Sequence, residues 1–194
     1  MDMGGADGGV FRARRDIAPD APLLLVLPGS RPSEVRRMTP VYEQTIQKLR
    51  VSIPDLQVAV IVAATVKEDV TSRVAAWPFR VHLVDEDEKY DAMKAATAAL
   101  ATSGTVSTEL GLAGAPMVIA YRIDGLSYAL MKRVVTAKHV TLFNIAAEER
   151  IAPEFIQNDA TPAKLAMAVK RLLMDPDAAA EQARRQSAAL EQMG

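Results

Sequence analysis

The sequence predicts an α/β protein with a doubly wound parallel sheet and a helical C-terminal tail. Its strand-like runs are apolar throughout rather than alternating, which is typical of parallel strands buried on both faces. Segments with helical periodicity lie between these runs, and this alternation favours a doubly wound sheet. The strands are expected at 23–27, 57–63, 80–84, 116–121 and 140–144, with a weaker one at 98–102.

The helix predicted most clearly covers 33–50, where Val35, Met38, Tyr42 and Ile46 repeat every three to four residues. Thr161 is a suitable N-cap for a helix over 161–174, with Pro162 at its first position. No strand is expected between this helix and the one that follows it. Further helices are expected at 66–76, 88–97, 106–114 and 126–135, and after Asp175-Pro176.

Three segments are expected along the chain. Residues 1–20 begin with an unpatterned, glycine-rich stretch and are interpreted as the remnant of a linker. Residues 21–175 form the α/β domain, and 176–194 form the helical tail, which is interpreted as truncated.

Composition narrows the classes of function. The chain has 194 residues, 49% hydrophobic and 24% charged, which is enough for one folded core. Its formal net charge of −1 provides no overall positive field, so no nucleic-acid partner is expected. Cysteine is absent and histidine occurs only as His82 and His139, which excludes thiolate and histidine-rich metal sites.

The loop after the first strand is a candidate ligand site, because open parallel sheets bind ligands beyond the carboxyl ends of their strands. Gly29 lets the backbone turn tightly and approach a ligand, Ser30 offers a hydroxyl, and Arg31 offers a planar guanidinium that matches phosphate. A tight turn with a solvated arginine explains these residues about equally well.

A second candidate lies at 102–105. Ser103, Gly104 and Thr105 are small residues at the entry of a helix, whose free N–H groups can bind an anion. Glu109 follows about one turn later, roughly 5–6 Å along the axis, which is the step from a nucleotide's phosphate to its ribose. An ordinary helix cap followed by a helix-favouring glutamate is the alternative.

The acidic run from Asp85 to Glu88 follows the strand at 80–84 and could hold a divalent metal. A solvated first turn that complements the helix dipole is the favoured interpretation, so no metal site is expected. The sequence contains neither a Walker A loop nor a G-x-S-x-G elbow.

Three segments together resemble the lipid-A-disaccharide synthase family. They are LPGSRPSEVRRMTPVY at 27–42, ATSGTVSTELGLAGAPMVIAYR at 101–122 and FNIAAEERIAPEFIQ at 143–157. The second is shared more loosely with other glycosyltransferases that have two Rossmann-like domains (the GT-B type). The resemblance runs from about Val10 to Met174.

The resemblance implies that 21–175 are the Rossmann-like carboxyl-terminal half, which binds the UDP of a sugar donor. The family transfers 2,3-diacylglucosamine from its UDP derivative to 2,3-diacylglucosamine 1-phosphate, with inversion to a β-1,6 linkage and without metal or other cofactor. The substrate-binding residues carried over by motif are Gly29, Ser30 and Arg31, then Ser103, Gly104, Thr105 and Glu109, and finally Arg122 and Asn144.

The family enzyme is about twice as long as this chain, and its acceptor-binding amino-terminal domain, with the general base, has no counterpart here. We therefore expect no catalytic residue in this chain and no turnover by the chain alone. The implied partners are UDP, UDP-2,3-diacylglucosamine, the missing domain and a second copy in a homodimer. The implied location is cytoplasmic, with peripheral contact between the full enzyme and the inner membrane of a Gram-negative bacterium.

The third segment departs from the family pattern, because Glu148 and Glu149 stand where glycine and arginine are usual. This change favours one alternative, a catalytically silent nucleotide-binding or assembly module. Another UDP-sugar enzyme, such as a UDP-N-acetylglucosamine epimerase, is a further alternative. His82 and His139 are interpreted as structural.

Overall fold

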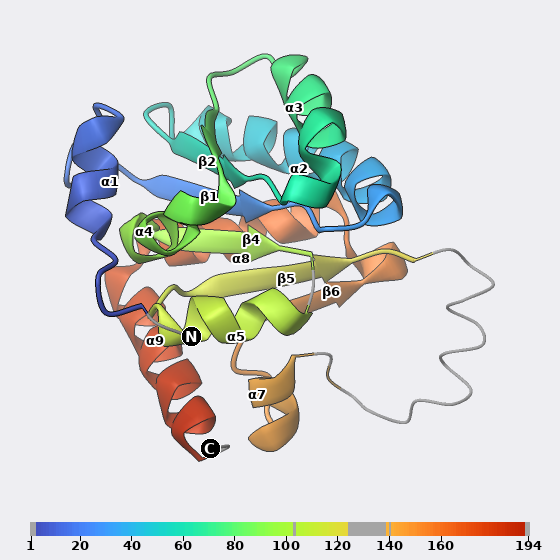
Figure 1. Cartoon of the computed structure of the whole chain (residues 1–194). Coiled ribbons are helices and arrows are strands. Elements are labelled where there is room, and N and C mark those ends of the chain that lie inside the picture. The colour runs from blue at the N-terminus through green and yellow to red at the C-terminus, as the bar shows by residue number, and fades with distance from the viewer. Residues whose placement is uncertain (1–2, 103, 124–138, 140, 193–194) are drawn as a thin grey trace.

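Six parallel strands form the central sheet of the computed structural model, which describes residues 3–102, 104–123, 139 and 141–192 (Figure 1). Their order is β3-β2-β1-β4-β5-β6, and every neighbouring pair is parallel. The direction of winding reverses between β1 and β4, which confirms the doubly wound prediction. The strands are β1 (Leu23–Leu27), β2 (Gln57–Ile61), β3 (His82–Val84), β4 (Ala98–Ala101), β5 (Met117–Tyr121) and β6 (Glu154–Ile156).

Helices cover both faces of the sheet, so each inner strand is buried on both sides. All five residues of β1 are buried. Leu24 and Val26 belong to one core cluster, and Leu23, Leu25 and Leu27 belong to the other. This two-sided burial explains the continuous apolar runs, because successive strand residues point to opposite faces.

The first core cluster lies under three helices: α2 (Pro32–Ser52), α3 (Lys67–Ala75) and α8 (Pro162–Met174). The helices that bury residues in the other cluster are α1 (Gly8–Arg14), α4 (Lys89–Ala95), α5 (Gly104–Leu112), α7 (Leu142–Ala146) and α9 (Pro176–Glu191). Short 3₁₀ turns lie at η1 (Ala64–Val66), η2 (Glu86–Glu88) and η3 (Gln157–Asp159). The helix expected at 126–135 lies outside the described residues.

The strand expected at 140–144 is wrong, because Leu142–Ala146 form helix α7. A short apolar run has no decisive periodicity, and here Phe143 is buried as part of a helix that packs on α5 and α9. The sixth strand is instead β6, which the sequence analysis did not identify. The residues of β6 are only half-buried, which explains why it lacks an apolar signal.

The segment 1–20, expected to be a linker remnant, contains helix α1. Asp7 caps this helix by accepting hydrogen bonds from the backbone of Gly9 and Val10, and the ring of Phe11 is only 1% exposed. A Cβ at Gly8 would lie 2.7 Å from backbone atoms of Lys94 and Ala95. Gly8 therefore allows α1 to approach α4 closely. A glycine-rich composition, which is typical of linkers, here permits close packing between two helices.

Helix α9, the expected tail, packs closely on the domain. The Gln182 side chain donates a hydrogen bond to the carbonyl of Met117 at 2.7 Å, and Gln186 donates one to that of Ala115 at 3.1 Å. Both glutamines are buried. At the start of the preceding helix α8, the Thr161 side chain accepts from the backbone of Lys164, which confirms the predicted cap. Among the described helices, none combines the length and the apolar character needed to cross a bilayer.

Candidate functional site

A cavity of about 830 Å³ lies at the carboxyl edge of the sheet, where β1, β4 and β5 end. Its position beside the β1/β4 reversal is the place where doubly wound sheets bind ligands. Gly29, Ser30, Arg31 and Glu109 line it, so the structure brings together residues from both loops that the sequence singles out. The other lining residues are mostly apolar, and include Leu27, Ile61, Met93, Val106, Ile119 and Leu142.

Glu34 organises the first of these loops, and the sequence analysis did not identify it. Its carboxylate is buried and accepts hydrogen bonds from the backbone N–H of Ser30 at 3.1 Å and of Arg31 at 3.3 Å. The Tyr121 hydroxyl donates to its other oxygen at 3.4 Å. A glutamate three residues after a helix N-cap is a known capping signal, but arginine at the cap position obscures it here.

Glu34 also explains Gly29, whose φ of +114° is strained for other residues. A Cβ at Gly29 would lie 2.6 Å from Oε2 of Glu34. The close approach predicted for a ligand is therefore taken by this carboxylate. The amides of Ser30 and Arg31 are occupied as well, so the loop can offer a ligand the Arg31 guanidinium and the Ser30 hydroxyl.

The Arg31 side chain is 75% exposed at the cavity wall. Its guanidinium lies 3.8 Å from Oε1 of Glu34, at the outer limit of an ion pair. The long side chain can therefore turn towards an anion in the cavity with little loss of contact. Arg31 is the N-cap residue of helix α2, so its backbone is fixed while its guanidinium can change position.

The second loop opens helix α5, which starts at Gly104 and Thr105. Ser103 lies outside the described residues. Thr102, just after β4, is buried and shares a 2.5 Å hydrogen bond with the hydroxyl of Tyr42, whose pKa burial raises above its usual value. In the first turns of α5, Val106 and Thr108 lie in the cavity wall, and the hydrogen bond between Thr102 and Tyr42 fixes the backbone just before the helix.

Glu109 is held by two residues that the sequence did not signal. Nζ of Lys89 donates to its carboxylate at 2.9 and 3.3 Å, and the Tyr90 hydroxyl donates at 3.2 Å. Burial would lower the pKa of Lys89, but the hydrogen bond and charge of Glu109 raise it overall. Glu109 is thus held in place by Lys89 and Tyr90, and its Oε2 has only the longer contact and can accept a hydrogen bond from another donor.

The acidic run has separate partners. Asp85 pairs with Lys67 at 2.7 Å, Glu88 pairs with Arg15 at 2.6 Å, and Glu86 lies in the cavity wall. Hydrogen bonding to Arg15 lowers the pKa of Glu88. Within the described part of the chain, no three His, Asp or Glu side chains are grouped as a metal site would require.

Arg122 lies outside this cavity. Its Nη2 donates to the carbonyl of Ala160 at 2.6 Å, and its side chain lines a separate groove. The second motif therefore predicts a residue at the correct edge of the sheet, but Arg122 lines a different pocket from the one that Tyr121 lines.

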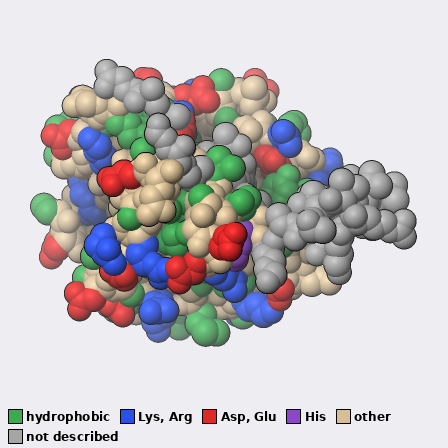
Figure 2. Space-filling model, turned by 90° about the horizontal axis from the view of Figure 1, so that it is seen from below, with side chains coloured by type: hydrophobic (Ala, Val, Ile, Leu, Met, Phe, Trp, Pro, Cys, Tyr) green, Lys and Arg blue, Asp and Glu red, His purple; other side chains and the backbone are tan. Residues whose placement is uncertain are grey.

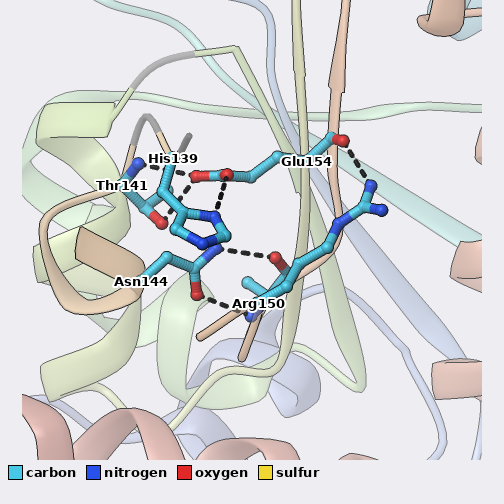
Figure 3. A network of polar contacts seen from close by, with 6 residues as sticks. His139, Thr141, Asn144, Arg150 and Glu154 are labelled. Carbon is cyan, nitrogen blue, oxygen red and sulfur yellow. Dashed lines mark hydrogen bonds and ion pairs between the residues drawn. The ribbon is translucent and has the colours of Figure 1, made fainter. Parts of the chain in front are cut away.

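Asn144 also lies outside the cavity and is fully buried (Figure 3). Its amide donates to the carbonyl of Ala152 at 2.9 Å and accepts from the N–H of the same residue at 3.0 Å. These bonds connect α7 to the segment before β6. Asn144 acts on the cavity indirectly, because α7 places Leu142 in its wall.

A second set of bonds fixes the start of α7 (Figure 3). Glu154 accepts from the backbone and hydroxyl of Thr141 at 2.7 and 2.8 Å, and from His139 at 3.3 Å. The two glutamates of the altered third motif follow α7: the Glu149 N–H donates to the carbonyl of Asn144 at 3.1 Å while its side chain pairs with Arg185, and Glu148 has a φ of +50°. The structural interpretation of His139 agrees with this arrangement.

The chain has a formal net charge of −1, so it has no overall positive field. Acidic and basic side chains are interspersed over the face shown in Figure 2, with no extended region of one sign. An anion that binds this protein must therefore be held by particular residues such as Arg31, rather than by the field of the whole molecule.

Comparison with known proteins places the chain in a family. The family model described as lipid-A-disaccharide synthetase matches residues 7–194. A lipid-A-disaccharide synthase from Rhodospirillum centenum is 49% identical over 177 residues, covering 91% of this chain and 44% of the relative. One from Paramagnetospirillum magneticum is 44% identical over 97% of this chain and 49% of the relative. The chain thus spans about half the length of the curated relatives it matches.

Solved structures show the same fold at low sequence identity. WaaG, a glycosyltransferase involved in lipopolysaccharide biosynthesis, superposes with a TM-score of 0.58 at 16% identity, covering 94% of this chain and 46% of that one. The UDP-GlcNAc 2-epimerase from Neisseria meningitidis bound to UDP-GlcNAc superposes with a TM-score of 0.59 at 12% identity, over 95% and 48%. With the family model matching nearly its whole length, this chain belongs to the lipid-A-disaccharide synthetase family.

Proposed function

We propose that this chain is the donor-binding half of a lipid-A-disaccharide synthase and that its cavity binds the UDP of UDP-2,3-diacylglucosamine. The observation that carries the proposal is the convergence of Arg31, the amino end of α5 and Glu109 on one cavity of about 830 Å³. An anion-binding helix end and a carboxylate one turn further along match a diphosphate and the ribose next to it.

Each group would have a distinct role. The amino end of α5 and the Arg31 guanidinium would stabilise the diphosphate, whose negative charge grows as the sugar is transferred. Glu109 would accept hydrogen bonds from ribose hydroxyls while Lys89 holds its carboxylate in place. The apolar part of the wall would contact the base.

The transfer reaction would also need groups from the other half of the enzyme. The 6-hydroxyl of 2,3-diacylglucosamine 1-phosphate attacks the anomeric carbon, the bond to the diphosphate breaks, and its electron pair leaves with UDP. The hydroxyl proton goes to a general base, which we assign to the half of the relatives that this chain does not match. Proximity to acceptor and base is then lost, so the chain alone binds the donor without turnover.

The test is calorimetric titration of the chain with UDP in the absence of added metal. Arg31→Ala and Glu109→Gln should each weaken UDP binding by at least about tenfold, the scale of a charge-assisted hydrogen bond. Arg36→Ala is the matched control, because Arg36 is exposed on the same helix and does not line the cavity. It should change the affinity less than about twofold.

A folded chain that binds no UDP would overturn the proposal and favour the catalytically silent module. Equal effects of Arg31→Ala and Arg36→Ala would show that only general charge matters. Circular dichroism of each variant separates loss of binding from loss of fold.

A further inference from the structure

A second groove, of about 710 Å³, is lined by Arg122, while the preceding residue, Tyr121, lines the donor cavity. It is formed where α2, the end of β5, η3 and the start of α8 meet. None of its described lining residues is shared with the donor cavity, so it is a separate feature of this edge. Those residues are Arg37, Pro40, Val41, Gln44, Arg122, Ile123, Gln157, Asn158 and Pro162.

The charged residues in the described lining are two arginines, with no carboxylate among them. Arg37 makes no hydrogen bond or ion pair with any residue that the structure describes, although most of the described arginines have such a partner. Arg37 is half-buried on α2 and lines the groove, so its guanidinium charge is available to a ligand there.

Arg122 carries a second unsatisfied group. Its Nη2 donates to the carbonyl of Ala160 at 2.6 Å, which fixes the plane of the guanidinium. Its Nε is buried and has no hydrogen-bond partner. A buried, charged N–H without a partner is rare in folded proteins, and the guanidinium that carries it belongs to a residue lining the groove.

The floor of the groove is rigid. The side-chain amide of Gln157 makes two hydrogen bonds to the backbone of Ile123: it accepts from the N–H at 2.8 Å and donates to the carbonyl at 3.1 Å. These bonds connect the end of β5 to η3 and fix the backbone that carries Arg122. Asn158 and Gln44 add amide groups to the wall.

We propose that this groove, defined by Arg37, Arg122, Gln44 and Asn158, is a phosphate-monoester binding site distinct from the donor cavity. Two guanidinium groups match the charge of a phosphate monoester, which approaches −2 at neutral pH, better than the single charge of a carboxylate. The planar arginine forks match adjacent phosphate oxygens, and the amides donate to the remaining one. The site does not depend on UDP occupying the donor cavity.

The test uses the full chain and inorganic phosphate at constant ionic strength, followed by titration of amide and arginine Nε NMR signals. Arg37→Gln should weaken phosphate binding at this groove about tenfold. Arg36→Gln, which removes the same charge from the neighbouring exposed position, should leave it within about twofold. The Arg122 Nε signal should shift on titration in the parent chain and in Arg36→Gln.

Arg31→Gln separates the two sites, because phosphate bound in the donor cavity would respond to Arg31 and not to Arg37. The proposal is overturned if phosphate fails to shift the Arg122 signal, or if Arg36→Gln weakens binding as much as Arg37→Gln. It is also overturned if binding depends on Arg31 alone. A loss of UDP binding with intact phosphate binding would leave this site standing and refute only the donor site.

Vesicles identify the source of the phosphate. Flotation with phosphatidylcholine vesicles that contain phosphatidic acid presents a monoester on a lipid headgroup. Binding that Arg37→Gln reduces and free phosphate competes assigns the groove to a headgroup. Binding of free phosphate without vesicle binding assigns it to a soluble monoester.

Discussion

Glu34 and Gly29 pack against each other at the start of α2. The buried carboxylate of Glu34 accepts hydrogen bonds from two backbone amides that would otherwise bind water. Gly29, at a φ of +114°, has no Cβ and so leaves room for this carboxylate. Because the carboxylate already occupies those amides, an anion in the cavity must be bound by the Arg31 side chain and by α5. A single buried glutamate thus decides which groups of the loop remain available.

Gly29→Ala should therefore destabilise the chain by about 1–3 kcal/mol, through backbone strain and the clash with Glu34. Gly114→Ala is the control, since Gly114 also has a positive φ, +74°, but open space around its Cβ position. Urea unfolding should show a larger loss for Gly29→Ala than for Gly114→Ala. Equal losses would mean that strain alone acts and that the contact with Glu34 is unimportant.

The free energy of unfolding should depend on pH because of His82. Burial, together with the charges of Arg80 and Arg15, lowers its pKa in the folded state. The unfolded chain then binds a proton more readily near pH 6.5, so stability is fully present above that pH and is lost as the pH falls below it. His82→Gln should lose less stability than the parent between about pH 7.5 and 5.5 in urea unfolding. A parallel loss in both proteins would contradict this assignment.

Among the elements, α1 shows most clearly how packing overrides composition. Its glycines are typical of a flexible segment, yet Phe11 is 1% exposed and the Arg15 guanidinium lies 4.1 Å from the centre of its ring. The Arg12 side chain donates to the carbonyls of Ala18, Ala21 and Ala95 and so connects the helix to the loop before β1. The helix is therefore part of the domain.

Phe11→Ala should lower the free energy of unfolding by about 3–5 kcal/mol, the usual cost of removing a buried aromatic ring. Val10→Ala in the same helix should cost less than about 0.5 kcal/mol, because Val10 is 41% exposed. Thermal or urea unfolding of the two variants gives the comparison. A small effect of Phe11→Ala would mean that the segment behaves as a linker after all.

On the scale of the whole molecule, the donor cavity joins the two halves of the sheet, because β1 and β4 lie on opposite sides of the reversal. A ligand in this cavity contacts loops from both halves and should stabilise the whole domain. Since the described unit contains its own core on both faces of the sheet, we expect this stabilisation to appear as one cooperative transition.

UDP at about one hundred times its dissociation constant should stabilise the chain by about 2.7 kcal/mol. For a chain of this size that corresponds to an upward shift of the melting temperature of about 5–10 °C. Glu109→Gln at the same UDP concentration should show a smaller shift, because less of it is bound. An unchanged melting temperature of the parent chain in UDP would contradict binding to the folded state.

The amino-acid sequence by itself determined the fold class, the first five strands, and the edge of the sheet where the cavity lies. Continuous apolar runs and helical periodicity are local signals. They predict the folded structure correctly because those apolar side chains fill the cores on both faces of the sheet. The loops at 28–31 and 102–105 could be located in the sequence, because glycine and small polar residues between a strand and a helix indicate a turn. Gly29, Arg31 and Glu109 do meet in one cavity.

Only the tertiary structure decided the rest. Lys89 and Tyr90 contact Glu109, which lies about 20 residues further along the chain, and no sequence pattern predicts such a contact. Glu34 accepts from the backbone of Arg31, an unusual N-cap residue that hides the capping pattern. The tertiary structure also assigned Arg122 and Asn144 to places outside the donor cavity, and made α7 a helix and β6 a strand. The physical reason is that these features depend on contacts between distant parts of the chain. Short segments with weak periodicity, such as α7 and β6, take the conformation that satisfies the buried polar groups of their neighbours and fills the core.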